Sequence, residues 1–181
     1  MNQILQIPIV TADLATEPVT LQEAKDWMAV THSEEDDIIE EMITAARQMI
    51  EKYTGLSFGQ KEITAVIQMD GCGTPYALPM GPTISIAAIT SHVAFESNDA
   101  LVAGTDYALV AGLLHNQVAG LMEIDYVAGF LELPEELKHD VLRVTAWLYQ
   151  NRGIRFQAET EPLPYPEWNS LAANKYVQTV V

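Results

Sequence analysis

S33-E-E-D-D-I-I-E-E-M-I-T-A-A-R-Q-M-I-E-K-Y-T-G55 is the clearest helix signal in the chain. Ser33 is a favourable N-cap, because its hydroxyl can accept a hydrogen bond from a free backbone N–H in the first turn. The acidic residues that come after it suit the positive end of the helix dipole. Gly55 is expected to end the helix, because glycine adopts the left-handed conformation at little cost. Apolar spacings of three and four predict one buried stripe, formed by Ile38, Ile39, Met42, Ile43, Ala46, Met49, Ile50 and Tyr53.

The opposite face of this predicted helix is strongly acidic. It carries Glu34, Glu35, Asp37, Glu40, Glu41 and Glu51, against Arg47 and Lys52. The whole chain of 181 residues has a formal net charge of −16 and nine basic residues. Gripping a nucleic-acid backbone needs clustered lysine and arginine, so this composition argues against it. It fits an acidic solvated surface, a surface that must not adhere to DNA, or one that meets a basic partner.

Composition and targeting signals indicate a soluble, cytosolic protein. Hydrophobic residues make up 49% of the chain and charged residues 19%, as in a folded domain. Cys72 is the only cysteine, so no intramolecular disulfide can form. The N-terminal residues lack the pattern of a signal peptide. No apolar run approaches the roughly 18 residues that a membrane helix needs.

The rest of the chain predicts an α+β fold, with an N-terminal helix pair and C-terminal helices packed with a small antiparallel β meander. Thr20 and Glu23 form a capping box that opens a helix reaching about Met28. Strands are expected at residues 61–69, 76–79, 84–95 and 121–128, with a hairpin of 106–110 and 113–118. Pro134 suits the first position of a helix that reaches about Asn151. A short final helix is expected over residues 167–177.

We expect three parts along the chain. Residues 1–19 form an extended arm, which is apolar enough to lie on its own domain or on a neighbouring subunit. Residues 20–152 form the main domain, with helices in 20–55, the β region in 60–129 and a helix in 134–151. Residues 153–181 form a C-terminal segment that either folds back or binds a partner. Its candidate partner-interface residues are Trp168, Leu171 and Tyr176.

No constellation of side chains predicts catalysis, a metal or a cofactor. The four histidines are His32, His92, His115 and His139, and no pair has the i, i+4 spacing of a helical metal site. Cys72 lies between two turn glycines and would need an adjacent base to act as a nucleophile. A disfavoured alternative is a small acidic metal-dependent enzyme that uses Asp36, Glu40 or Glu135 with His139. We expect no enzymatic activity and no cofactor.

Several segments, in order, resemble the head–tail connector (adaptor) proteins of long-tailed bacteriophages. P18-V-T-L-Q-E-A-K-D-W-M-A-V30 resembles the family pattern V-T-L-x-E-A-K-x-x-L, and I43-T-A-A-R-Q-M-I-E-K-Y-T-G55 resembles I-x-A-A-R-x-x-I-E-x-x-T-G. Residues 124–130, 133–137 and 146–152 are similar to V-x-Y-x-A-G, x-P-x-x-(I/L) and H-W-Y-x-N-R. Position 146 is alanine where the family has histidine, and residues 154–181 match only loosely.

The resemblance implies a structural virion protein at the head–tail interface, assembled in the host cytoplasm. Such proteins form a homo-oligomeric ring, generally of twelve subunits, beneath the portal protein. The ring extends the DNA channel and is the assembly platform for a stopper or tail-completion protein. Another morphogenesis component, such as a stopper or tail terminator, is the alternative. DNA would pass without specific binding, and the candidate lumen-facing residues are Glu34, Glu35, Asp37, Glu40 and Glu41.

Overall fold

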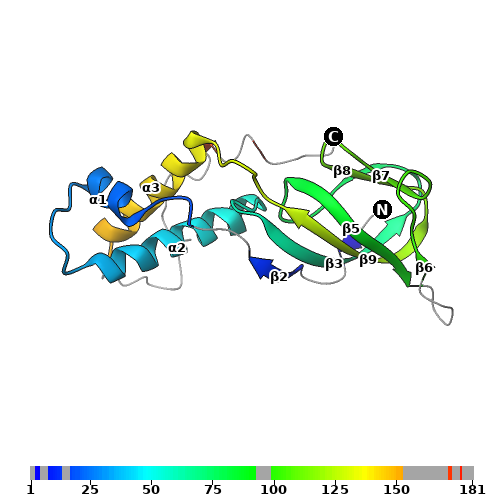
Figure 1. The fold of residues 1–181 in the computed structure, drawn as a ribbon, viewed down its shortest axis with the longest axis horizontal. Helices are drawn as coiled ribbons and strands as arrows, with labels where there is room; N and C mark the ends of the chain where they lie inside the picture. The colour runs from blue at the N-terminus through cyan, green and yellow to red at the C-terminus, as the bar shows by residue number, and fades with distance from the viewer. Residues whose placement is uncertain are drawn as a thin grey trace, which may run out of the picture. The chain divides into compact units, whose positions relative to one another are not determined.

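The structure, a computed structural model, describes residues 3–4, 8–13, 17–92, 99–152, 171–172 and 176. It divides into two compact units. Unit 1 takes its described residues from 1–16 and 55–131, and unit 2 takes them from 17–54 and 132–176. The described residues form three helices and two antiparallel sheets (Figure 1), which confirms the predicted α+β class.

Unit 2 contains the helices α1 (Leu21–Met28), α2 (Asp36–Thr54) and α3 (Glu135–Gln150). The predicted capping box at the start of α1 is confirmed. Thr20 Oγ1 accepts a hydrogen bond from the Glu23 N–H (3.2 Å), and the Glu23 carboxylate accepts one from the Thr20 N–H (2.7 Å). Pro134 is the N-cap of α3 and not its first helical residue, one position from the prediction.

The start of α2 and the width of its buried stripe differ from the prediction. The helix begins at Asp36, because residues 33–35 form a turn in which the Ser33 carbonyl accepts a hydrogen bond from the Asp36 N–H (3.3 Å). Ile38 and Tyr53 are 44% and 47% exposed, so they lie outside the stripe. Gly55 comes directly after the helix with a φ of +69°, as predicted. The buried stripe consists of Ile39, Ile43, Ala46 and Ile50, with Thr54 at its end.

A charge network around Arg47 joins α2 to the segment that precedes α1. Arg47 donates from Nε and Nη2 to the two carboxylate oxygens of Glu17, at 2.9 Å each. Its Nη1 donates to Glu51 (3.0 Å), and Thr44 Oγ1 donates to Glu17 (3.0 Å). The Arg47 and Glu51 side chains are only 13% and 7% exposed. Glu51, predicted for the acidic outer face, is therefore a buried member of this network.

Unit 1 contains a six-stranded sheet with the order β1-β3-β9-β5-β6, in which β2 also pairs with β3. A smaller sheet has the order β4-β8-β7. The strands of the larger sheet are β1 (Gln3–Ile4), β2 (Ile9–Asp13), β3 (Lys61–Asp70), β5 (Thr83–His92), β6 (Asp99–Ala100) and β9 (Ala119–Ala128). Those of the smaller sheet are β4 (Pro75–Ala77), β7 (Tyr107–Val110) and β8 (Leu113–Asn116).

The core of unit 1 lies on one face of the larger sheet. β3 and β9 pair in an unbroken antiparallel register from Lys61↔Ala128 to Asp70↔Ala119. Because side chains alternate between the two faces of a strand, every second residue is buried along β3 and, from Met122 onward, along β9. The Tyr126 hydroxyl donates to the Pro79 carbonyl, and burial raises the pKa of Tyr126. The core cluster contains Ile63, Ala65, Ile67, Met69, Leu78, Ile89, Leu114, Met122, Ile124, Tyr126 and Ala128.

The N-terminal arm and the hairpin have defined places in unit 1. β1 and β2 pair antiparallel with β3, so the described part of the arm lies on its own chain. The hairpin of β7 and β8 turns at Ala111 and Gly112, whose φ values of +51° and +78° are typical of a type I′ turn. The end of the expected strand 84–95 and most of the expected helix 167–177 lie outside the described residues.

Loss of the Arg47 network is expected to destabilise unit 2. Arg47→Ala leaves the buried Glu51 carboxylate without its guanidinium, which should lower the free energy of unfolding by about 3 kcal/mol. Arg47→Lys should recover only part of this loss, because an ammonium cannot bind a carboxylate through two parallel N–H groups. Chemical denaturation measures both changes. The control, Lys52→Ala at an exposed position of the same helix, should change stability by less than about 1 kcal/mol. Equal effects of Arg47→Ala and Lys52→Ala would contradict a structural role for the network.

Candidate functional site: the acidic face of unit 2

Three of the predicted lumen-facing residues form an exposed acidic strip on α2. Asp37, Glu40 and Glu41 are all exposed and lie within little more than one helical turn. Together with Thr44, Ala45 and Gln48 they line a shallow, open depression. Within the described ranges, the structure gives these three carboxylates no side-chain hydrogen bond and no ion pair. We call Asp37, Glu40 and Glu41 the acidic strip.

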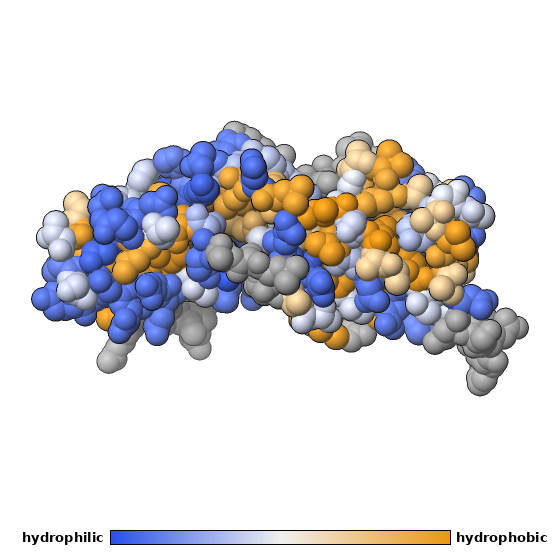
Figure 2. Space-filling model, viewed as in Figure 1, coloured by the Kyte–Doolittle hydropathy of each residue, from blue (hydrophilic) through white to orange (hydrophobic). Residues whose placement is uncertain are grey.

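Two basic side chains of unit 2 bind other carboxylates and not those of the acidic strip. Arg47 is held by Glu17 and Glu51, and Lys25 donates to Asp36 at 2.5 Å. Like charges three and four residues apart on a helix repel one another, so the strip costs stability and is not explained by helix formation. In Figure 2 the surface around α2 is predominantly hydrophilic, whereas apolar residues gather over the strands of unit 1.

Glu35, predicted for the same surface, is bound to the C-terminal end of α3. The Tyr149 hydroxyl donates to its Oε2 (2.5 Å), and Arg152 Nη1 donates to its Oε1 (2.6 Å). The hydrogen bond from Tyr149, and after it the one from Arg152, lowers the pKa of Glu35 below its usual value. The same contact with Glu35 raises the pKa of Tyr149. Glu35 therefore fixes the linker between α1 and α2 to α3, and its charge is neutralised locally.

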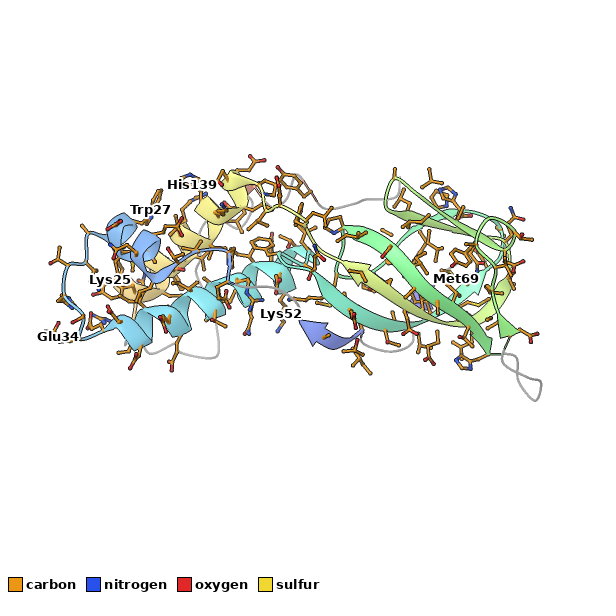
Figure 3. The ribbon with its side chains drawn as sticks, in the orientation of Figure 1. Lys25, Trp27, Glu34, Lys52, Met69 and His139 are labelled. Atoms are coloured by element: carbon orange, nitrogen blue, oxygen red, sulfur yellow. The ribbon has the colours of Figure 1, made fainter. Side chains whose placement is uncertain are left out.

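Glu34 lies beside Glu35 but has a different environment. Its side chain is 80% exposed, and its carboxylate lies 3.1 Å from His32 Nδ1. Figure 3 shows Glu34 at the linker that precedes α2. Of the five residues predicted to face a channel, Glu34 and the acidic strip are thus exposed, and Glu35 is a structural contact.

The residues of the alternative metal site do not form a metal-binding cluster. Asp36 is paired with Lys25, and the His139 ring packs edge-to-face against Trp27 with centroids 5.4 Å apart (Figure 3). The Glu135 carboxylate forms an ion pair with Lys138, three residues later in α3 (2.6 Å). The described part of the chain contains no group of three or more His, Cys, Asp or Glu side chains that could hold a metal ion. Of the described helices, none has the length and apolar character needed to cross a membrane.

The candidate partner-interface residues of the C-terminal segment are only partly described. Leu171 is 3% exposed, and the Tyr176 hydroxyl donates to Glu136 of α3. Trp168 lies outside the described residues. Leu171 is thus buried and Tyr176 is tied to α3, so in this structure neither side chain is free for a partner.

Sequence reasoning missed two structural contacts of the acidic residues in unit 2. Glu17, which holds Arg47, lies 30 residues away from it and carries no local signal. The role of Glu35 depends on Tyr149 and Arg152, which are more than one hundred residues later in the chain. The only available hint was that Arg152 closes a segment that resembles the connector pattern.

Comparison with known proteins gives a family and a fold. Residues 17–158 match the sequence profile of a family described as head completion protein. The fold is similar to that of a chain in the neck of an empty gene transfer agent particle, computed with C6 symmetry. The TM-score is 0.66 at 20% identity, and the match covers 97% of each chain. No curated protein sequence matches the chain.

Two further solved structures have the same fold. One matching chain comes from the virion of the native gene transfer agent particle. The other comes from the neck of the native particle, computed with C12 symmetry. For each, the TM-score is 0.64 at 20% identity, and the match covers 94% of this chain and 95% of the other.

The Glu35 contact predicts a pH-dependent contribution to stability. A carboxylate whose pKa is lowered by folding stabilises the folded state above its unfolded pKa, and this contribution is lost as the pH falls through the folded pKa. Glu35→Gln should therefore lower the melting temperature at neutral pH, and the difference from wild type should shrink as the pH falls below about 4.5. Thermal unfolding monitored by circular dichroism across this range measures it. Glu34→Gln is the matched control and should show no such pH-dependent difference. A constant Glu35→Gln difference at all pH values would contradict the contact.

Proposed function

The chain belongs to the head completion protein family, and on this premise we propose that it is a structural subunit of the neck of a phage-like particle. The observation that carries the proposal is the shared fold, over nearly the full length of both chains, with the neck of a gene transfer agent particle. We propose that copies of the chain form a ring between the portal and the tail. The C6 and C12 symmetry of the similar necks supports a cyclic arrangement, in which identical chains occupy equivalent positions around one axis.

We further propose that the acidic strip borders the DNA channel of this ring. Asp37, Glu40 and Glu41 repeat in every copy, so a ring would carry a continuous band of negative charge. Such a band repels phosphates and gives them no cation to displace, so DNA would move through without being held. Glu34 would extend the band, whereas Glu35 would not, because Tyr149 and Arg152 bind its carboxylate.

The portal contact of the C-terminal segment is proposed for Trp168. Leu171 is buried and Tyr176 bonds to Glu136, so Trp168 is the remaining candidate among the three predicted interface residues. Tryptophan is among the residues that contribute most to interface affinity. A stopper or tail-completion protein would bind the opposite end of the ring.

Native mass spectrometry of the purified chain, alone and with the portal protein of its particle, tests the ring. The expected result is a closed ring, formed either by the chain alone or only with the portal protein. A chain that stays monomeric and does not bind the portal protein would contradict the proposal. That outcome would favour another morphogenesis component, such as a stopper or a tail terminator.

Charge reversal of the acidic strip tests its place in the channel. Assembled rings of the triple variant Asp37→Lys, Glu40→Lys and Glu41→Lys should retain linear double-stranded DNA. They should not retain covalently closed circular DNA of the same length, which cannot thread a closed ring. Retention should fall by about tenfold or more between 50 and 200 mM salt, because several phosphates are neutralised. Filter binding of both DNA forms measures this.

The matched control reverses three other exposed acidic residues, Glu62, Asp99 and Glu132. These rings should show no preference for linear DNA. Equal retention of linear and circular DNA by the acidic-strip variant would place the strip on the outer surface of the ring. Wild-type rings should retain neither form.

A further inference from the structure

Among the described strands of the larger sheet in unit 1, β2 and β5 each have a free edge that is nearly without charge. We propose that these edges join neighbouring copies, with β2 of one copy pairing with β5 of the next. The inference rests on the proposed ring and names the surfaces that would close it. It is drawn from the order of the strands, their exposure and their lack of charge.

The first free edge belongs to β2. One side of β2 pairs with β3, from Ile9↔Thr64 to Asp13↔Lys61, and no described strand pairs with its other side. Ile9 and Val10 are 50% and 40% exposed, which is high for β-branched apolar residues in a strand. The stretch from Ile9 to Ala12 contains no charged residue. Unpaired N–H and C=O groups on such an edge are a template for another strand.

The second free edge belongs to β5. One side of β5 pairs with β9, and β6 covers only Thr90 and Ser91 on the other side. The Leu101 N–H then bonds to the Ile89 carbonyl (2.9 Å). For residues 83–88, no described strand pairs with that outer side. Ala87 and Ala88 lie in this stretch, and both are exposed.

The two edges carry few of the residues that usually protect an exposed edge: β5 has none of them, and β2 has only Asp13 at its end and Pro8 directly before it. Natural sheet edges are commonly shielded by lysine, by proline or by other charged side chains. The ten residues of β5 contain no Asp, Glu, Lys, Arg or Pro, although charged residues make up 19% of the whole chain. Two register shifts bend β5 between Thr83 and Ala88, so a strand that pairs along it must be short. β2, with five residues, has a suitable length.

Strand direction also permits this pairing. β2, β3, β9 and β5 are each antiparallel to the next, so β2 runs opposite to β5. If the ring axis runs along the strands, the rotation that relates one copy to the next leaves the direction of every strand unchanged. β2 of one copy would then lie antiparallel to β5 of its neighbour and continue the existing pattern. Contacts between two different surfaces of identical subunits close into a ring when the rotation divides a full turn.

A second copy of this chain is the occupant that the two edges favour. Each copy supplies one β2 edge and one β5 edge, so in a closed ring every β2 edge and every β5 edge gains one partner. An unrelated extended peptide would satisfy only one of the two edges. Pairing through backbone hydrogen bonds also avoids bringing together the charged side chains of a chain with a net charge of −16.

Amide hydrogen exchange of the ring, compared with that of the free chain, tests the pairing directly. Peptides that cover residues 9–13 and 83–88 should exchange at least about tenfold more slowly in the ring, because their outer N–H groups become hydrogen-bonded. The β7 strand, residues 107–110, is the internal reference. Unchanged exchange of both edge segments in assembled rings would overturn the proposal.

Substitution of the β5 edge gives an independent test. The double variant Ala87→Glu and Ala88→Glu should lose at least about tenfold in ring yield, with the melting temperature of the free chain unchanged. The matched control, Ala108→Glu and Ala111→Glu, places the same charges at exposed positions of the β7–β8 hairpin and should assemble normally. Equal yields for the edge variant and wild type, or equal losses for both variants, would overturn the pairing. Absence of any wild-type ring, even with the portal protein, would instead reject the proposed function.

Discussion

The pairing of β3 with β9 is the constraint on which unit 1 depends. These strands pair over ten residues without a bulge, and a shift of one residue would turn every core side chain to the outer face. β3 also supplies the edge on which β1 and β2 lie, and β9 supplies the edge for β5. The smaller sheet contributes Leu114 to the cluster formed on the inner face of this pair. The positions of both free edges of the sheet therefore depend on one register.

Local signals in the sequence predicted most of the elements. The capping box of α1, the hairpin of 106–110 and 113–118, and the strands at 61–69 and 121–128 each depend on residues that are close in the chain, and the structure confirms these elements. Contacts between distant residues were not predictable. Glu51 was expected on the surface because it lies on the acidic face of the predicted helix. In the structure it is buried, and its carboxylate accepts a hydrogen bond from Arg47. Ser33 has the properties of an N-cap, but the hydrogen bond from the Asp36 N–H to its carbonyl starts a turn first.

The acidic residues of unit 2 have two different roles. One group is structural: Glu17, Glu35 and Glu51 each bind an arginine, and their carboxylates are used by the fold. The other group, the acidic strip, has no such use among the described residues and remains exposed. The sequence alone assigned Glu35 to the second group because it is adjacent to Glu34 and close to Asp37. Glu35 differs from its neighbours because the end of α3 places Tyr149 and Arg152 beside it. This placement depends on how the three helices pack and cannot be read from the local sequence.

The two units are interleaved along the chain, and this has a consequence for the order in which the protein can be made. Unit 1 takes its described residues from 1–16 and 55–131, and unit 2 takes them from 17–54 and 132–176. During synthesis, β2 leaves the ribosome long before β3 and β9, and α2 leaves it long before α3. Neither unit has all its elements until most of the chain has been translated. In unit 1, the pairing of β3 with β9 also joins residues about sixty positions apart, which favours slow folding. The N-terminal arm, α1 and α2 would expose apolar side chains until their partners have been translated. A chaperone would protect the growing chain during this period.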